Sequence, residues 1–306
     1  MELPEELAFI ANARKPQRTT SARMDGRLCV ITGATSGVGY ETAKEFARGG
    51  ASLIMVCRSG EKAARVCQEL TKEYDTACEI VLADFARLAE VREAAQTISD
   101  MADRIDVLIN NVGVHRTRRT LTEDGIEMVF CVNHLASFLL TRLLLDRLKS
   151  SAPSRIIQVN SQGHRFGGLD LNDINWERRP YHGLWSYGAS KVAQLHTVRE
   201  LSKRLFGSDV TINAMHPGAV KTGIGMDNGP IYRWYRRNII NRFLKDARIG
   251  GKAIYYLAAA PEVARVSGRY FNLTIEESPA PYVMKPDVSQ PVWRISEELT
   301  GLSGMA

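Results

Sequence analysis

The chain has few cysteines and no long apolar run. Its five cysteines, Cys29, Cys57, Cys67, Cys78 and Cys131, have neither the paired spacing of a disulfide framework nor the spacing of metal ligands. This pattern favours reduced thiols in an intracellular compartment and no metal site. No apolar stretch approaches the roughly 20 residues of a membrane-spanning helix. No segment rich in proline, glycine or serine marks a linker, so we do not expect several domains joined by linkers.

The net charge of +6 comes from 40 basic and 34 acidic side chains, and the basic residues are mostly scattered singly. Scattered positive charge does not predict a nucleic-acid partner, but it suits a phosphorylated cofactor or a membrane surface. The first residues, MELPEELAFIANARKP, are acidic where a signal peptide is basic, and they lack a continuous apolar core. The expected location is the cytoplasm, with peripheral membrane association left open.

Short runs rich in β-branched residues alternate with longer amphipathic segments. The predicted strands are 27–32, 52–57, 79–83, 106–110, 155–160, 210–215 and 268–272. The predicted helices are 38–49, 61–73, 87–102, 123–149, 185–206 and 247–260. Near-continuous apolar strands separated by helices predict a parallel sheet of about seven strands with helices on both faces. We expect a single doubly wound α/β domain over residues 24–306, preceded by an extension over residues 1–23.

A glycine-rich turn joins the first predicted strand to the first predicted helix, in the stretch TGATSGVGYETAKEFA. Gly33 permits a tight turn, Gly37 lets the backbone approach a pyrophosphate, and Gly39 lets the helix pack closely on the strand. The N–H groups and the partial positive charge at the start of the helix suit phosphate oxygens. At the first strand-to-helix junction of an alternating chain, this turn predicts a dinucleotide site.

The spacing TGxxxGxG, rather than GxGxxG, resembles the short-chain dehydrogenase/reductase family. Further motifs stand in that family's order: NNVG at 110–113, Asn133 in FCVNHLASF, Ser161 in QVNS, YGASK at 187–191 and HPGAVKT at 216–222. The segments TEDGIEMVFCVNHLASFLLT, SAPSRII and RISEELTGL are similar to the family's retinol-dehydrogenase-like branch, to which protochlorophyllide reductases are related. The resemblance implies a Rossmann-type sheet with strand order 3-2-1-4-5-6-7 and a nicotinamide-dependent oxidoreductase.

Tyr187 and Lys191 are separated by about one helical turn and should project from the same helix face. A phenol has a pKa of about 10, and an ammonium ~4–5 Å away favours the phenolate by ~3–4 kcal/mol at an effective dielectric of about 20. Tyr187 is therefore the expected general acid/base, and Lys191 is the residue that tunes it. The resemblance implies that Lys191 also binds the nicotinamide ribose. It further implies that Ser161 holds the substrate oxygen and that Asn133 anchors a water of the family's proton relay.

An arginine follows the second predicted strand, in MVCRS, where an acidic residue would select NAD(H). Since Cys57 takes the acidic position and the guanidinium of Arg58 can pair with a 2′-phosphate, we expect NADP(H), with NAD(H) as the alternative. Asp84 resembles the family's adenine-contacting aspartate, although it could instead cap the following turn. The motifs and the resemblance together imply these cofactor-binding residues: Gly33, Thr35, Ser36, Gly37, Val38, Gly39, Arg58, Asp84, Phe85, Asn111, Gly113, Tyr187, Lys191, Pro217, Gly218, Val220 and Thr222.

The long segment between Ser161 and Tyr187, with the residues after NNVG, is expected to line the substrate side of the cleft. Its aromatic and polar side chains suit a ring-bearing or long apolar alcohol or ketone. The candidate substrate residues are His115, Gln162, His164 and Trp185. Residues 223–246 resemble the family's substrate lid, and their interleaved aromatics and arginines also suit shallow membrane contact. The resemblance implies that pairing often uses the helices at 134–149 and 186–205. The assembly stays open, because the lid-like segment and the N-terminal extension could block or reroute such a homo-oligomer.

Three positions depart from the family pattern: Val112 stands for an alanine, Asn160 for a serine and Ala136 for a glycine. None removes a group that the chemistry needs. The favoured function is an NADP(H)-dependent oxidoreductase that interconverts an alcohol and its carbonyl on a bulky apolar substrate, retinoid-, steroid- or polyketide-like. Two alternatives stay open: a carbon–carbon double-bond reductase of the protochlorophyllide type, and a non-catalytic dinucleotide-sensing protein.

Overall fold

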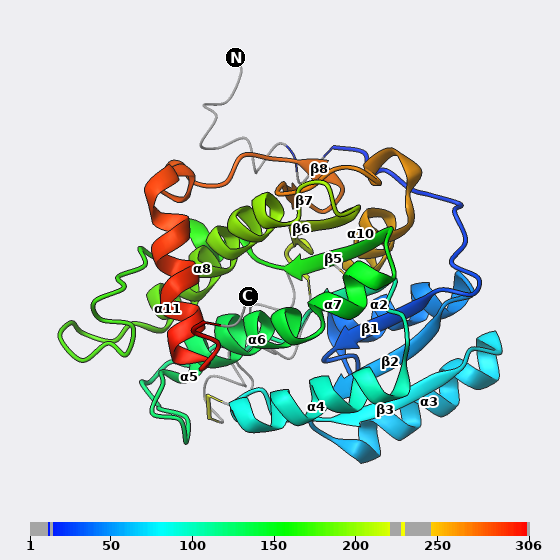
Figure 1. Ribbon diagram of the computed structural model, residues 1–306, viewed down its shortest axis with the longest axis horizontal. Helices are drawn as coiled ribbons and strands as arrows, with labels where there is room; N and C mark the ends of the chain where they lie inside the picture. Colours follow the sequence, from blue (N-terminus) through cyan, green and yellow to red (C-terminus); the bar gives the residue numbers. More distant parts are fainter. Residues whose placement is uncertain (1–11, 13–14, 221–227, 230–245, 305–306) are drawn as a thin grey trace.

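The computed structural model describes residues 12, 15–220, 228–229 and 246–304. An eight-stranded sheet runs through its centre, with strand order β3-β2-β1-β4-β5-β6-β7-β8 (Figure 1). The strands are β1 (Leu28–Thr32), β2 (Ser52–Cys57), β3 (Cys78–Leu82), β4 (Val107–Asn110), β5 (Ser154–Val159), β6 (Val210–His216), β7 (Tyr270–Asn272) and β8 (Ile275–Glu276). The first seven strands are parallel and confirm the predicted Rossmann-type order.

The eighth strand was not predicted. It has two residues and pairs antiparallel with β7, Asn272 opposite Ile275. So short a strand carries no alternating pattern that a sequence could show. It closes a hairpin at the edge of the sheet. Glu277 follows this strand directly and contacts Gln162 and Arg165 of η3, near the site described below.

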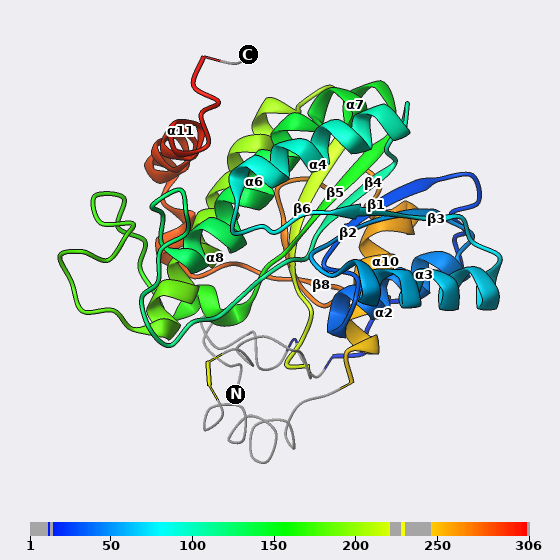
Figure 2. The same cartoon turned by 90° about the horizontal axis from the view of Figure 1, so that it is seen from below.

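Helices cover both faces of the sheet, as predicted. They are α2 (Gly37–Arg48), α3 (Gly60–Tyr74), α4 (Leu88–Met101), α5 (Met128–Phe130), α6 (Ala136–Leu143), α7 (Leu145–Ser150), α8 (Gly183–Arg204), α10 (Arg248–Ala259) and α11 (Ser289–Leu299). Shorter helical turns are η2 (Cys131–Leu135), η3 (Gln162–Arg165), η5 (Pro261–Val263), η6 (Pro281–Met284) and η7 (Pro286–Val288). Figure 2 shows α4, α6 and α8 on one face and α2, α3 and α10 on the other.

Alternate residues of each strand supply the two cores that these layers enclose. In β1, Val30 belongs to the core under α4, α6 and α8, whereas Cys29 and Ile31 belong to the core under α2, α3 and α10. Because both faces are buried, the strands are apolar throughout, which is why they could be recognised as members of a parallel sheet. At the switch point, β1 lies between β2 and β4, and ligands of such sheets bind beyond the carboxyl ends of these strands.

The helix predicted over 123–149 is interrupted. A π-helical turn, η2, separates α5 from α6, and α7 begins after a further break at Leu144. The carbonyl of Asn133, inside the π turn, accepts hydrogen bonds from the side chains of Ser137 and Gln194. Such turns widen a helix locally and often occur at functional sites.

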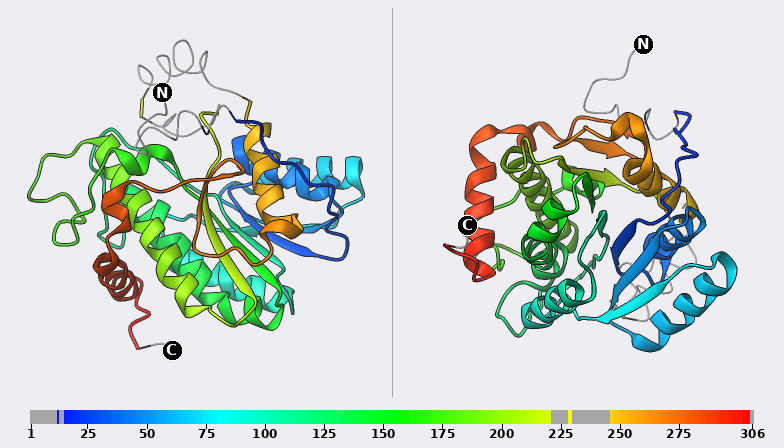
Figure 3. Two further views of the ribbon diagram at one scale, coloured as in Figure 1. Left: turned by 90° about the horizontal axis from the view of Figure 1, so that it is seen from above. Right: turned by 45° about the vertical axis from the view of Figure 1, so that its right-hand side comes forward.

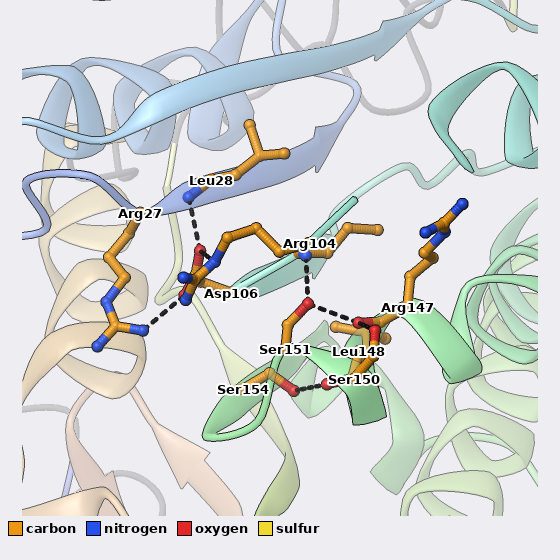
Figure 4. Close-up of polar contacts among 10 residues, drawn as sticks. Arg27, Leu28, Arg104, Asp106, Arg147, Leu148, Ser150, Ser151 and Ser154 are labelled. Atoms are coloured by element: carbon orange, nitrogen blue, oxygen red, sulfur yellow. Dashed lines mark hydrogen bonds and ion pairs between the residues drawn. The ribbon is translucent and has the colours of Figure 1, made fainter. Parts of the chain in front are cut away.

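The amino ends of the central strands are tied together by Asp106, far from the switch point (Figure 4). Its carboxylate accepts hydrogen bonds from Arg27 (2.6 Å), from Arg104 (3.1 Å) and from the backbone N–H of Leu28 (2.9 Å). Burial disfavours the charge, but these donors outweigh it and hold the pKa of the Asp106 carboxyl below its usual value. Nearby, Ser151 Oγ accepts from Ile105 N at 2.7 Å.

The C-terminal helix α11 was not predicted either, and it packs against α8 and α6 (Figure 3). Trp293 meets the Phe138 ring edge-on with centroids 4.9 Å apart, and His134 Nε2 lies 2.7 Å from Ser296 Oγ. These helices include the pairing surface that the family resemblance implies. A homo-oligomer built on that surface would therefore have to accommodate or displace α11.

The sequence predicted that all five cysteines are reduced thiols, and the structure shows that this is wrong for two of them. Cys67 of α3 and Cys78 of β3 form a disulfide, with Cα atoms 5.6 Å apart, while Cys29, Cys57 and Cys131 are free and buried. The turn between α3 and β3 brings these two cysteines together, although their spacing in the sequence matches no known disulfide framework. The described residues contain no helix with the length and apolar character needed to cross a membrane. In the same part of the chain, no three His, Cys, Asp or Glu side chains are grouped as metal ligands.

Candidate active site

The glycine-rich turn lies at the carboxyl end of β1 and leads directly into α2. Gly33 and Gly37 have φ values of +70° and +57°, which side chains disfavour. A Cβ on Gly39 would come within 2.5 Å of Asn111 Nδ2, so only glycine lets α2 approach this closely. The N-cap residue Ser36 makes no side-chain hydrogen bond to the first turn, which leaves the helix N–H groups for an external acceptor. The turn therefore fits the pyrophosphate of a dinucleotide.

Thr32 and Asn111 hold this turn to β4. The Thr32 hydroxyl accepts from the N–H groups of Asn111 (2.9 Å) and Val112 (3.1 Å), and Asn111 Nδ2 donates to the carbonyls of Thr32 (2.9 Å) and Gly33 (3.2 Å). Asn111 thus acts as a brace beneath the cofactor site. Val112, the bulkier residue of the NNVG motif, packs against Gly33: a Cβ there would lie 3.0 Å from Val112 Cγ2.

The residues expected at the adenosine end follow β2 and β3. Arg58 is exposed, and within the described part of the chain no hydrogen bond or ion pair occupies it. Asp84 Oδ1 accepts from Ala86 N at 3.0 Å, so it does cap the following turn. Phe85 is buried in the core at 4% exposure, so only its backbone is available to an adenine.

The loop after β6 passes close to the start of α2. A Cβ on Gly250, in α10, would lie 3.0 Å from Pro217 and 3.3 Å from Val38, so the three elements meet here. Gly218 has φ +87°, and Val220 is buried. Pro217, Gly218 and Val220 can therefore form a wall beside the glycine cradle. Thr222 lies outside the described residues.

The expected catalytic side chains converge next to this cradle. A Cβ on Gly113 would lie 3.6 Å from Asn133 Oδ1 and 3.9 Å from Lys191 Nζ. Lys191 Nζ is 5.6 Å from the centroid of the Tyr187 ring. A Cβ on Gly163 would lie 2.7 Å from Tyr187 Cε1 and 3.3 Å from Ser161 Oγ. Segments distant in sequence thus place all four predicted catalytic residues around one small space.

Lys191 is only 3% exposed. Burial disfavours its charged form and lowers its pKa to about 7. Two acceptors oppose that effect: Nζ donates to Val159 O and to Gln194 Oε1, each at 3.1 Å. The ammonium therefore lies in a site where the protein supplies part of the solvation that water would give.

Ser161 is oriented by its neighbours. Its Oγ accepts from Gly163 N at 3.0 Å, so the hydroxyl proton can be donated to another oxygen. Its N–H donates to Asn160 Oδ1 at 2.8 Å, and Asn160 Nδ2 donates to Lys191 O at 2.9 Å. Asn160, which looked like a mere departure from the family pattern, therefore joins the Ser161 turn to the helix that bears Tyr187 and Lys191.

Asn133 has both ends of its side chain engaged. Its Oδ1 accepts from Val114 N at 2.7 Å, and its Nδ2 donates to Val114 O and to Ser190 Oγ. These bonds fix the loop after NNVG to α8. The backbone carbonyl of Asn133 accepts a hydrogen bond from Gln194 Nε2.

On the substrate side, His115 lies beside Tyr187, and the substrate roles of His115 and Trp185 stay predictions. The His115 ring is 6.0 Å from the Tyr187 ring, at an edge-on angle of 70°. Trp185 is 50% exposed, and its ring lies 4.9 Å from that of His182 at a tilt of 41°. Of the lid-like segment 223–246, only Asn228, Gly229 and Asp246 are described. Asn228 donates to His115 O at 2.9 Å, which connects that segment to the cleft.

Gln162 and His164 both have hydrogen-bond partners within the protein. For His164, which is fully buried, this corrects its assignment to the substrate, whereas for the half-buried Gln162 the assignment stays a prediction. Gln162 donates to Glu277 at 2.7 Å and accepts from Arg165 at 2.7 Å. His164 is fully buried: Nδ1 lies 2.7 Å from Ser161 O, and Nε2 accepts from Ala280 N at 3.1 Å. Burial lowers the pKa of His164 to about 4, so the ring is neutral. His164 therefore supports η3 from inside the protein and presents no polar atom to a substrate.

The sequence reading missed Glu127. This carboxylate is fully buried, accepts from the N–H groups of Val129 and Phe130, and also accepts from Tyr181 Oη and Ser186 Oγ at 3.1 Å. It therefore fastens the start of α8, one residue before Tyr187. Burial raises the pKa of the Glu127 carboxyl. In the sequence, Glu127 stands before the apolar run MVFCV, a pattern that indicates a helix cap and says nothing of contacts with α8.

A glycine cradle at the switch point of a parallel sheet, with a tyrosine and a buried lysine beside it, is the arrangement of a nicotinamide-dependent oxidoreductase. The chain belongs to the short-chain dehydrogenase/reductase family, because the family model described as short chain dehydrogenase matches residues 27–231. Within that family it is retinol-dehydrogenase-like. Retinol dehydrogenase 13 of Homo sapiens is 40% identical over 290 residues, covering 92% of this chain and 87% of that protein. Human retinol dehydrogenase 14 is 40% identical over 295 residues, with 91% and 88% coverage.

Solved structures agree on the fold. An uncharacterized protein from Mycobacterium paratuberculosis matches with a TM-score of 0.75 and 30% identity, over 94% of this chain and 98% of that one. A short chain dehydrogenase from Shigella flexneri, complexed with NADP, matches with a TM-score of 0.66 and 21% identity, over 83% and 99%. The second likeness concerns the fold alone. Membership of the family makes this chain an oxidoreductase of alcohols and carbonyls that uses NAD(P)(H).

Proposed function

We propose that the protein is an NADP(H)-dependent oxidoreductase that interconverts an alcohol and its carbonyl on a bulky apolar substrate. The observation that carries the proposal is the position of Tyr187. Its ring lies between Gly163 and His115, with Lys191 Nζ 5.6 Å from its centroid. No other described tyrosine has a buried lysine over its ring.

Each side chain has a distinct role in this chemistry. When bound, the nicotinamide cofactor supplies or accepts the hydride. The Ser161 hydroxyl, held by Gly163 N, donates to the substrate oxygen, and the Tyr187 hydroxyl gives or takes its proton. The Lys191 ammonium favours the ionised phenol. The phosphates would be held by the turn from Gly33 to Gly39.

Arg58 supports a preference for NADP(H). It follows β2 directly, is exposed, and has no carboxylate partner among the described residues. The buried thiol of Cys57 takes the position where a carboxylate would bind ribose hydroxyls. A guanidinium in this place can pair with a 2′-phosphate in a bidentate manner.

Exposed apolar side chains near the start of α8 support an apolar substrate. Phe166, Leu184 and Trp185 are 64%, 54% and 50% exposed, and all three lie within the segments that precede or begin α8. Large apolar side chains that stay exposed beside a cleft often serve a ligand. The relatives named retinol dehydrogenase point toward a retinoid, and steroid- and polyketide-like substrates have the same bulk and polarity.

The test is a screen of retinoid, steroid and polyketide-like carbonyls with NADPH, following its absorbance, on the wild type and on Tyr187→Phe. Tyr187→Phe should lose about 10²–10⁴-fold in kcat while still binding NADPH. Tyr74→Phe, on the surface helix α3, is the matched control and should keep full activity. An active Tyr187→Phe enzyme would refute the role of Tyr187. NADPH binding without turnover of any carbonyl would favour the dinucleotide sensor, and light-dependent reduction of a pigment double bond would favour the other alternative.

A further inference from the structure

The side chain of Gln194 lies between two groups of the site. It is on α8, 1% exposed, on the same helix face as Lys191. Its Oε1 accepts from Lys191 Nζ at 3.1 Å and from Asn160 Nδ2 at 2.9 Å. Its Nε2 donates to the carbonyl of Asn133. One amide therefore connects the ammonium, the Ser161 turn and the π-helical turn.

We propose that Gln194 is a positioning residue that bridges the Asn133 carbonyl to the Lys191 ammonium and so fixes the cation beside Tyr187. The inference rests on the proposed function, in which that cation acts on the phenol. An amide serves this purpose because it accepts at one end and donates at the other. A water molecule could bridge the same groups, but it would be free to leave, whereas Gln194 is held by the helix.

The amide oxygen of Gln194 is one of the few groups near Lys191 that stabilise its positive charge. Among the described residues, the ionisable side chains near enough to interact electrostatically with the ammonium are Tyr187 of α8, His134 of η2 and His216 of β6. Burial lowers the pKa of His134 to about 3 and that of His216 to about 4, so both rings are neutral at neutral pH. The charge of Lys191 is therefore stabilised in the free protein by the two acceptors, Val159 O and Gln194 Oε1. Removing one of two acceptors should favour the neutral amine.

The first measurement needs neither cofactor nor substrate. Lysine labelled with ¹³C at Cε is incorporated, the Lys191 resonance is assigned by its loss in Lys191→Arg, and its titration is followed by NMR. Gln194→Leu should lower the midpoint by about one pH unit or more, and Gln194→Glu should raise it by a similar amount. The matched control is Thr197→Val, on the same helix, where a buried hydroxyl without a hydrogen-bond partner among the described residues is removed. It should leave the midpoint unchanged.

Equal midpoints in Gln194→Leu and Thr197→Val would overturn the proposal. If Gln194→Leu does not fold, judged by its circular dichroism, the upward shift in Gln194→Glu still decides. A chain that turns over no carbonyl at all would defeat the proposed function while leaving this titration readable. The two failures are therefore distinguishable.

The second measurement is the pH profile of kcat/KM. Gln194→Leu should lower kcat roughly tenfold near neutral pH, since a bond to a charged group is lost. The high-pH limb of the profile should move toward lower pH as the cation is lost earlier. A structural role alone would reduce the amount of folded enzyme without moving the profile. A profile identical to that of Thr197→Val would contradict the positioning role.

Discussion

Gly163 lies directly against the ring of Tyr187: a Cβ on Gly163 would be 2.7 Å from Tyr187 Cε1 and 2.9 Å from Cδ1. The backbone of the η3 turn lies equally close to α8, because a Cβ on Gly188 would be 2.8 Å from Gly163 O. The η3 turn and α8 thus meet through two glycines. This approach puts the Ser161 hydroxyl, which bonds to Gly163 N, next to the phenol. The relative position of the two reacting side chains depends on the absence of a side chain at Gly163.

A methyl group at this position should therefore impair catalysis. Gly163→Ala is expected to displace the Tyr187 ring and to lower kcat by about 10–100-fold, since small misplacements of a reacting group are costly. NADPH affinity should change little, because Gly163 does not border the glycine cradle. The measurement is steady-state kinetics with the best carbonyl from the screen. The control is Gly168→Ala, where an added Cβ would meet nothing within 4 Å. Equal activity in the two variants would contradict the steric argument.

The cofactor preference gives a second prediction. Arg58→Ala should weaken NADPH binding by about 10–100-fold, the loss of a charge-assisted bidentate contact, while NADH binding changes little. Fluorescence titration with both cofactors measures this difference. Arg65→Ala removes an exposed arginine of α3 that already pairs with Glu61, and it serves as the control. A wild-type enzyme with clearly higher kcat/KM for NADH would contradict the preference itself.

The sheet and the glycine turn could be predicted because their signals are local. Residues such as Val30 and Ile31 are buried on opposite faces, so the strand is apolar throughout, and Gly33 and Gly37 need a backbone that few residues tolerate. Gln194 could not be assigned in this way. A glutamine in a helix is usually solvated, and two of its partners, Asn160 directly after β5 and Asn133 of η2, are far away in the sequence.

The same reason explains the other differences. His164 in a loop resembled a ligand-facing residue, and only the packing of η3 against Ala280 shows that it is buried. Cys67 and Cys78 form their disulfide across a turn whose geometry the sequence does not encode in cysteine spacing. In each case the deciding contact is tertiary. Such contacts depend on which elements become neighbours, and this depends on the whole fold.

Asp106 gives a prediction about stability and pH. Its pKa in the folded protein is below the ordinary value of 3.8, so its stabilisation is present above that value and is lost as the pH falls through the folded pKa. Asp106→Asn should lower the free energy of unfolding by about 2–4 kcal/mol at neutral pH, because Arg27, Arg104 and Leu28 N lose a charged acceptor. The difference from the wild type should narrow below about pH 4.

Urea unfolding at several pH values measures that difference. Asp103→Asn is the matched control, since Asp103 is fully exposed and pairs with Arg147 only at 3.7 Å. Exposed pairs of this kind contribute little. A difference between Asp106→Asn and the wild type that stays constant down to acid pH would show that the carboxylate charge is not what stabilises the strand ends.

Trp293 gives the last prediction, because it anchors α11 over α6 and α8, the helices at which the family resemblance implies pairing. It is 2% exposed, meets Phe138 at 4.9 Å, and lies under the guanidinium groups of Arg142 (5.0 Å) and Arg204 (4.4 Å). Trp293→Ala should lower the free energy of unfolding by about 3–5 kcal/mol, whereas Trp185→Ala, at a half-exposed tryptophan, should cost far less. Loosening α11 would also uncover Phe138, so self-association measured by light scattering should rise with concentration in Trp293→Ala. A variant as stable as the wild type, with unchanged mass, would mean that α11 does not protect this surface.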